Sequence, residues 1–534
     1  MWRPTRRRFL VFFIVTLSLV AAPLRARAEV PAKHLSIMFN GAAGKVGGSC
    51  FLLDADGEKV LLDCGLAFDA ESDAGGASDS EPLFAFEPKT ITAVVLSHIH
   101  LDHAGALPLL VKQGFHGRIH ATRVTRELAA IALQGCYRYG DFGMETFYVS
   151  TRSQGKKTAT VHVRPDCESG SKIRQRKEFQ GHRTALEANG QHVCRRCMEL
   201  ELDEVMRLFD EHPYHVPFVV GSRFTATLQP TGHIPGSAMT TIVLQRSNGT
   251  FRVIWSGDYG GGTHPFLPQP ETVKEGQVML VESTYGGNTD PEKDPVPELL
   301  SVVSGALAQG RRVLVPAFTL DRSQRVLAAL AQGRRVGTVP DVPVYLTSRT
   351  IEEYTLAYQR FSRDRATYGE SFNVGFFSDP FRGLTWKMFH GKTAPSGPSV
   401  VVASSADGKY GACAELLPAY VADPKAVVVK VGWSDPSSPM GRLWAAQQRG
   451  ASTVELSPSH TVALRASLSS VSLSAHGHAS SVAKVALGCR GLRTLFLVHG
   501  EPDGLASFAA YLRTLLPREV QIRVPHKAEQ VQLF

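Results

Sequence analysis

The stretch SHIHLDHAGALP, residues 97–108, follows an apolar, β-branched run that predicts a buried strand. Beyond it the pattern becomes helical, so its polar residues stand where a strand ends and a helix begins. Residues i and i+2 of an extended segment point the same way, so His98 and His100 can hold one cation together. Asp102 and His103 lie past the bend and face a second position. Imidazole and carboxylate groups suit Zn²⁺, with Mn²⁺ or Fe²⁺ as alternatives, and packing does not readily explain such a cluster.

Three further polar residues stand at the ends of predicted strands. Asp63 closes an apolar run and precedes a glycine, although a plain turn aspartate is the alternative interpretation. His233 lies between two glycines after the predicted strand 224–228, where the backbone can approach a metal closely. Asp258 follows the predicted strand 251–255, in the place of a carboxylate that bridges two cations.

The HxHxDH string and these strand-end residues resemble the metallo-β-lactamase superfamily. The resemblance implies an α/β fold, an αββα sandwich, with two divalent metal ions. In that family the residue at Asp63 supports the metal-binding loop without binding metal, as a metal-bound histidine needs a partner for its other nitrogen. The resemblance implies seven metal ligands: His98, His100, Asp102, His103, His233, Asp258 and His499.

The later motifs select a branch of this superfamily. The segment ESTYG at 282–286 follows another predicted strand and resembles motif A of the β-CASP nucleases, a family that includes RNase J. LSAH at 473–476 resembles motif B, and LVHGE at 497–501 resembles motif C. The resemblance spans nearly all of residues 35–510, and it implies an inserted α/β cap, the β-CASP domain, that closes over a single nucleic-acid strand.

The same resemblance assigns roles to individual residues. His499 of motif C is implied as the last ligand of the second metal. His476 of motif B is implied to donate a proton or a hydrogen bond to the scissile phosphate, and to pair with Glu282 of motif A. The family usually has an acid two residues after the motif B histidine; His478 stands there instead and is a rival for the role. The predicted catalytic set is Asp102, Asp258, Glu282 and His476.

Substrate contacts and domain boundaries come from looser matches. RVLVPAF at 312–318, followed by Arg322, resembles the opening of the cap, and the region around Arg442 resembles its closing segment. Both arginines are predicted to contact substrate. The predicted organisation is a signal peptide at 1–28, a metallo-β-lactamase domain at 29–289 with a polar insertion at 137–197, a β-CASP cap at 290–455, and the second part of the first domain at 456–534.

The composition is that of a large folded protein with a basic balance. The chain has 534 residues, 43% of them hydrophobic, which is ample for a large core and two or more domains. The formal net charge of +9 is compatible with a polyanionic partner, although an arginine-rich composition alone gives the same balance.

The N-terminus predicts export. TRRRFL at 5–10 resembles the twin-arginine consensus, the apolar core at 9–22 is short for a membrane span, and ARA at 26–28 is an A-x-A cleavage site. We therefore expect a periplasmic or secreted protein with no stable membrane insertion after cleavage. An uncleaved membrane anchor is the alternative.

The polar insertion carries basic residues and a CxxC pair. Its basic run can contact a phosphate backbone, although a solvated face is the more ordinary explanation. Cys194 and Cys197, with Cys167 nearby, can form a zinc knuckle or, in an oxidising compartment, a disulfide.

Three functional hypotheses follow. The first is a two-metal phosphodiester hydrolase that cleaves single-stranded nucleic acid, with RNA favoured over DNA as the substrate. The second is an exported hydrolase of the same fold that acts on another ester or a lactam, since RNA is scarce outside the cytoplasm. The third is a nucleic-acid binder without catalysis, which the intact ligand set argues against. The sequence leaves endo- or exonuclease mode and oligomeric state open.

Overall fold

The computed structural model describes residues 31–67, 83–139, 195–457 and 460–534, together with four short strands between 149 and 193. The predicted signal peptide at 1–28, and the side chains of the basic run and the cysteines of the insertion, lie outside the described residues. Within the described ranges, no helix combines the length and the apolar character that crossing a bilayer requires.

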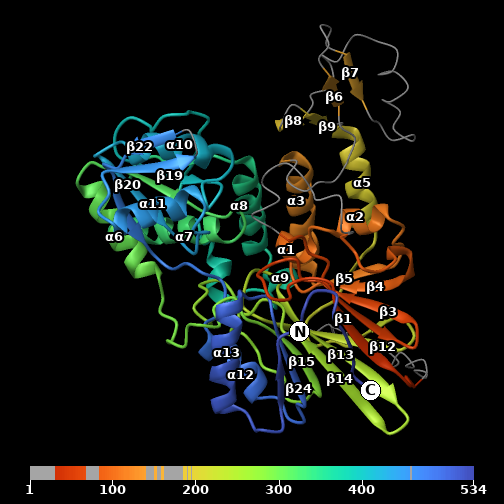
Figure 1. The fold of residues 1–534 in the computed structure, drawn as a ribbon. Helices are drawn as coiled ribbons and strands as arrows, with labels where there is room; N and C mark the ends of the chain where they lie inside the picture. Colours follow the sequence, from red (N-terminus) through yellow and green to blue (C-terminus); the bar gives the residue numbers. More distant parts are fainter. Residues whose placement is uncertain are drawn as a thin grey trace, which may run out of the picture.

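Two mixed sheets of seven strands stack face to face in the described part of the chain (Figure 1). The first sheet has the order β10 (Phe209–Glu211), β5 (Arg118–Ala121), β4 (Ile91–Val95), β3 (Glu58–Leu62), β2 (Phe51–Ala55), β1 (Leu35–Phe39) and β26 (Gln530–Gln532). The second has the order β11 (Phe218–Val220), β12 (Phe224–Pro230), β13 (Ala238–Arg246), β14 (Gly249–Trp255), β15 (Val278–Glu282), β24 (Thr494–Val498) and β25 (Gln521–Arg523).

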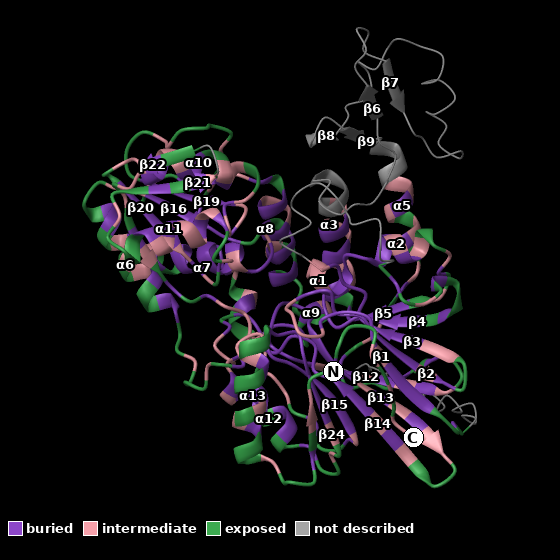
Figure 2. Ribbon diagram, in the orientation of Figure 1, coloured by how far each residue is buried: buried purple, intermediate pink, exposed green. Residues whose placement is uncertain are grey.

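The strands read as apolar runs because both faces of each sheet are covered (Figure 2). In β3, Val60 and Leu62 lie between the sheets, whereas Leu61 packs on the outer face with Leu107 and Leu128 of the covering helices. The first sheet is covered by α1 (Leu101–Ala104), α2 (Leu107–Lys112), α3 (Arg123–Tyr139) and α5 (Arg195–Arg207). The second is covered by α12 (Ala479–Leu487) and α13 (Pro502–Leu515). The result is the predicted αββα sandwich.

A third sheet forms the core of an inserted domain. The chain leaves the sandwich after β15 and returns to it with α12 and β24, and β24 pairs with β15 in parallel. Between them lies a six-stranded sheet in the order β18 (Lys387–Met388), β17 (Val344–Leu346), β19 (Ser399–Ala403), β16 (Arg312–Pro316), β20 (Ala426–Lys430) and β23 (Ser467–Ser470). Its helices are α6 (Val296–Ala308), α7 (Arg322–Arg335), α8 (Arg349–Ser362), α9 (Arg365–Tyr368), α10 (Gly411–Val421) and α11 (Pro439–Gln448).

Three two-stranded hairpins complete the described strands. They are β21 (Thr453–Ser457) with β22 (His460–Ala463), β6 (Val149–Arg152) with β7 (Thr158–Val161), and β8 (Ala185–Ala188) with β9 (Gln191–Val193).

The cap ends later in the chain than the predicted boundary at 455. That position falls inside β21, and β23 joins the cap sheet as the parallel neighbour of β20. The cap sheet therefore takes the chain to Ser470. The strand was missed because its sequence, SLSS, lacks the apolar run that marks the other cap strands.

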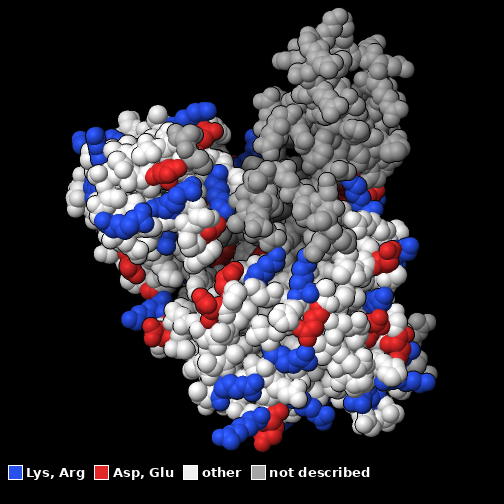
Figure 3. All heavy atoms as spheres, viewed as in Figure 1, with Lys and Arg blue, Asp and Glu red and all other residues white. Residues whose placement is uncertain are grey.

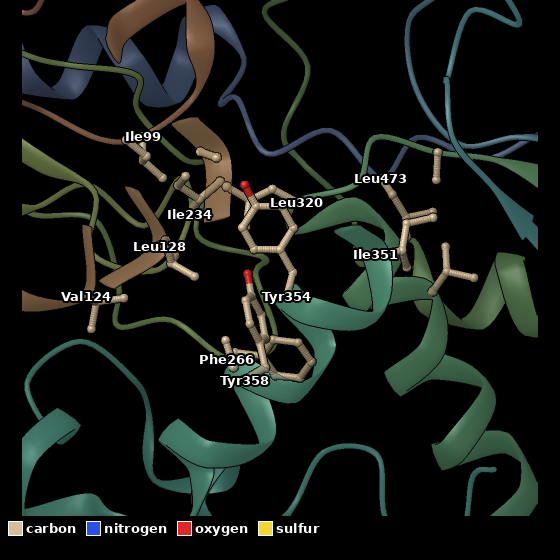
Figure 4. Close-up of a cluster of buried hydrophobic side chains, with 14 of the residues drawn as sticks. Ile99, Val124, Leu128, Ile234, Phe266, Leu320, Ile351, Tyr354, Tyr358 and Leu473 are labelled. Atoms are coloured by element: carbon tan, nitrogen blue, oxygen red, sulfur yellow. The ribbon is translucent and has the colours of Figure 1, made fainter. Parts of the chain in front are cut away.

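The cap packs directly against the sandwich. Tyr354 and Tyr358 of α8 lie beside Phe266 and Ile234 of the sandwich and Leu128 of α3 (Figure 4). All five side chains belong to one continuous core, so burial of this apolar surface stabilises the joint between the domains. The cap is thereby held over the strand ends that carry the predicted ligands.

Candidate metal centre

The predicted ligands meet because the strands that precede them end at one edge of the sandwich. In the first sheet, β3 and β4 run in parallel, with Leu62 beside Val95. In the second sheet, β15 runs in parallel with both β14 and β24, with Glu282 beside Val498. The loops that follow these strands therefore converge.

Four side chains form a first group: His98, His100, His233 and Asp258. Nε2 of His98 and Nε2 of His233 each lie 3.1 Å from Nδ1 of His100. Oδ2 of Asp258 lies 3.5 Å from Nε2 of His98 and 3.4 Å from Nε2 of His233. Four potential ligand atoms thus surround one position, at separations that suit a divalent cation.

Three side chains form a second group next to the first: Asp102, His103 and His499. Nε2 of His499 lies 3.3 Å from Nε2 of His103 and 3.2 Å from Oδ2 of Asp102. Oδ1 of Asp258 lies 3.1 Å from Nε2 of His103. Asp258 therefore faces the first group with one oxygen and the second with the other.

The donor set fits metal ions. Both carboxylate oxygens of Asp258 and Nδ1 of His233 are buried without a hydrogen-bond partner among the residues that the structure describes. Burial of an unpaired carboxylate is costly, and a cation between the groups removes that cost. Burial also lowers the pKa of His98, His100 and His233, with neighbouring histidines contributing, which keeps these rings in the neutral form that binds metal.

Asp63 holds the second group in place. Its Oδ2 accepts hydrogen bonds from Nδ1 of His103 at 2.8 Å and from Nε1 of Trp255 at 2.7 Å. The backbone N–H and the hydroxyl of Ser97 also donate to this carboxylate. These contacts fix the orientation of the His103 ring, with Nε2 turned toward the metal position. Asp63 is recognisable in the sequence as a strand-end carboxylate, whereas Trp255 and Ser97 carry no signal there beyond adjacency to the metal motifs.

We expect Asp63→Asn to weaken metal binding by about 10–100-fold while the protein stays folded, as is typical when the partner of a metal-bound histidine is lost. The measurement is metal affinity by competition with a chelator. Asp54→Asn is the matched control, because its carboxylate only caps the turn at Gly57 in the adjacent hairpin. Equal affinities for Asp63→Asn and the unmodified protein would remove Asp63 from this role.

Glu282 and His476 form a pair at the edge of the metal centre. Oε1 of Glu282 lies 2.9 Å from Nδ1 of His476, and the carboxylate also accepts from the backbone N–H groups of Tyr259 and Thr284. Nε2 of His476 lies 3.7 Å from Oδ2 of Asp258 and so faces the centre. Burial lowers the pKa of His476, but the carboxylates of Glu282 and Asp258 outweigh that effect and raise the pKa to about 9. Glu282 thus favours the protonated form of the ring.

His478 faces another way. Its Nδ1 contacts the carbonyl of Asp290 at 2.8 Å, and its backbone N–H donates to Glu292. Glu292 also accepts from the hydroxyl of Ser481, so this carboxylate caps the start of α12. The geometry therefore favours His476 over His478 as the group next to the metals.

The two predicted substrate arginines differ in position. The guanidinium of Arg322 lies over the ring of Phe318, 4.8 Å from its centroid, beside the backbone of Gly432. Arg442 instead donates to the carbonyl of Leu456 at 2.6 Å, inside the cap. Arg322 thus lies beside an exposed aromatic ring, while the contact of Arg442 is one that stabilises the cap.

Comparison with known families matches three consecutive parts of the chain. Residues 43–183 match the metallo-beta-lactamase superfamily, residues 323–443 match the Beta-Casp domain, and residues 461–525 match the Zn-dependent metallo-hydrolase RNA specificity domain. Together with the sandwich and its inserted sheet, these matches confirm the predicted fold class. The superfamily match also supports divalent metal binding.

Similar proteins span most of the chain. It is 29% identical to ribonuclease TTHA0252 of Thermus thermophilus, over 88% of this chain and 94% of that protein. It is 26% identical to the transcription termination factor FttA of Methanosarcina mazei and 25% identical to the cleavage and polyadenylation specificity factor 73 of Drosophila melanogaster, over 74% of this chain in each case. The alignments cover 55% and 50% of those two longer proteins.

Proposed function

We propose that this chain, in which a β-CASP domain interrupts a metallo-β-lactamase domain, is a two-metal ribonuclease that cleaves single-stranded RNA. The Glu282–His476 pair carries the proposal, because it places a proton donor beside a carboxylate shared by two groups of metal ligands. The similarity to a ribonuclease over nearly its whole length supports it. Zn²⁺ is the proposed metal, from the histidine-rich donor set.

The side chains of the site would have different roles in phosphodiester cleavage. Two divalent cations held by the seven ligands would activate water and polarise the phosphate. Asp258 keeps the two ligand groups together, and Asp63 orients His103. His476 would give its Nε2 proton to the leaving oxygen, and Glu282 would hold that ring through Nδ1 and stabilise its positive charge.

Exposed aromatic residues on the cap suit single-stranded nucleic acid. Phe318 and Trp433 follow the adjacent parallel strands β16 and β20, and their side chains are 50% and 58% exposed. Arg322 lies between the two segments, over the Phe318 ring and against Gly432. The carboxyl ends of parallel strands are a usual place for ligands, and aromatic faces with arginine are typical platforms for unpaired bases. On the face shown in Figure 3, basic and acidic side chains are interspersed, so the distribution of charge alone does not identify a binding path for RNA there.

The decisive experiment is digestion of end-labelled single-stranded RNA and DNA of one sequence, with added Zn²⁺ or Mn²⁺, beside a panel of small esters and a β-lactam. We expect metal-dependent cleavage of RNA, and the product ladder reports endo- or exonuclease mode. Hydrolysis of esters or lactam without cleavage of either nucleic acid would favour the alternative hydrolase instead.

We expect Phe318→Ala and Trp433→Ala each to weaken binding of single-stranded RNA by about 5–100-fold, since one stacked base is worth about 1–3 kcal/mol. The measurement is fluorescence anisotropy with a labelled oligonucleotide. Leu356→Ala, at an exposed position on α8, is the control for loss of an exposed apolar side chain. Unchanged RNA affinity in both aromatic variants would exclude this surface as the binding site.

We also propose that the protein is exported through the twin-arginine route, on the basis of the N-terminal sequence alone. Changing both Arg6 and Arg7 to lysine should retain the full-length precursor in the cytoplasm, as followed by cell fractionation and immunoblotting. Export of that variant at the normal level would refute the proposed route.

A further inference from the structure

We propose that His120, Asp210 and His212 form a third divalent-metal site, of zinc type, that shares no residue with the catalytic centre. His120 lies on β5 and Asp210 on the neighbouring strand β10, where the parallel register places the two residues side by side. His212 follows β10 directly, and its backbone N–H donates to the carbonyl of Ala121. The three side chains thus meet at the outer edge of the first sheet.

The distances suit one tetrahedral cation. Nδ1 of His120 lies 2.9 Å from Nε2 of His212, and Oδ2 of Asp210 lies 3.8 Å and 3.6 Å from these two nitrogens. Ligand atoms about 2.0–2.1 Å from a tetrahedral zinc ion lie about 3.4 Å apart, which is close to the mean of the three separations. The separations within the catalytic groups, 3.1, 3.3 and 3.5 Å, lie closer on average to this value than the three separations here do.

The surroundings hold both rings in the form and orientation that bind metal. The ring of His212 stacks on Phe218 of β11, with centroids 3.6 Å apart, and His120 packs against the same ring at 5.2 Å. Burial lowers the pKa of both His120 and His212, which favours the neutral imidazole. The side chain of Asp210 is 52% exposed, which gives the ion a path from solvent and leaves room for water as a fourth ligand.

The position of the site indicates a supporting role. Two residues beyond His212, the buried Tyr214 donates through its hydroxyl to the carbonyl of Ser237 at 2.9 Å. The hydroxyl of Ser237 accepts in turn from the backbone N–H of His233, which is a predicted ligand of the first metal. A cation on His212 would therefore fix the segment that supports the His233 loop, and its loss should lower stability more than chemistry.

The test is zinc content per chain, measured by mass spectrometry on tag-free full-length protein after zinc loading and dialysis. We expect three zinc ions in the unmodified protein and two in Asp210→Asn and in His212→Gln, with RNA cleavage within about twofold of normal at saturating zinc. His116→Gln is the control, because this exposed histidine precedes the same strand. Thermal unfolding should show a zinc-dependent increase in Tm that Asp210→Asn lacks.

Two results would overturn the proposal. One is two zinc ions in the unmodified protein, since this would leave the His120–His212 contact as a hydrogen bond only. The other is an unchanged zinc content in both variants. Asp210→Asn is informative beside His212→Gln because Asp210 is half-exposed and its replacement leaves the ring stack on Phe218 intact.

Discussion

Asp258→Ala is expected to abolish RNA cleavage, with a loss of about 10³-fold or more, while the protein remains folded. Divalent cations in such a centre are worth several kcal/mol in stabilising the charge that develops in the transition state, and each 1.4 kcal/mol is about tenfold in rate, so loss of the carboxylate that would hold both cations is costly. Asp258 is buried, and its two oxygens face both ligand groups without a hydrogen-bond donor in the described part of the chain. Removing it therefore disrupts both metal positions at once.

The measurements are turnover on single-stranded RNA, metal content and circular dichroism. Asp503→Ala is the matched control, because this exposed aspartate lies in the first turn of α13 and takes no part in the centre. Near-normal turnover by Asp258→Ala would exclude it as a bridging ligand and would leave the two groups of histidines as independent sites.

The fold and the catalytic cluster were predictable because their determinants are local in the sequence. The strands predicted at 224–228 and 251–255 lie within β12 and β14, and β15 is a short apolar run closed by Glu282. The ligands stand close after the ends of such strands, so a correct strand also places its ligand approximately. His499, and Asp63 that supports His103, directly follow their strands, and both adopt positive φ at the turn that leaves the strand.

Features that depend on pairing between strands distant in the sequence were not predictable. The cluster of His120, Asp210 and His212 exists only because β10 adds to β5 in parallel, and β10 has three residues without apolar periodicity. The boundary of the cap was placed too early for the same reason, because β23 is identified by its pairing with β20 and not by a pattern in its own sequence. Register between such segments is set by tertiary packing, which a single sequence does not display.

The choice between His476 and His478 shows how local geometry decides where sequence leaves two candidates. The residues are two apart, and both precede α12. His478 is the residue directly before the helix, and its ring contacts the backbone of Asp290. His476 lies two residues earlier, where Glu282 contacts its Nδ1 and its Nε2 faces Asp258.

His476→Ala is accordingly expected to lower turnover on single-stranded RNA by about 10²–10⁴-fold, the usual scale for loss of a general acid. Metal content should hardly change, because His476 belongs to neither ligand group. Glu282→Gln should cause a smaller loss, since it keeps the hydrogen bond to the ring and removes only the negative charge that stabilises it.

A substrate that needs no proton donor separates this role from a structural one. A phosphodiester with a nitrophenolate leaving group departs without protonation, so His476→Ala should cleave it nearly as well as the unmodified protein does, whereas a distorted metal centre would slow both substrates equally. His478→Ala is the control, and it should retain normal turnover on RNA. A large defect in His478→Ala with a small one in His476→Ala would transfer the role to His478. If neither histidine matters for RNA and small esters are cleaved as before, the ribonuclease assignment fails and the alternative hydrolase takes its place.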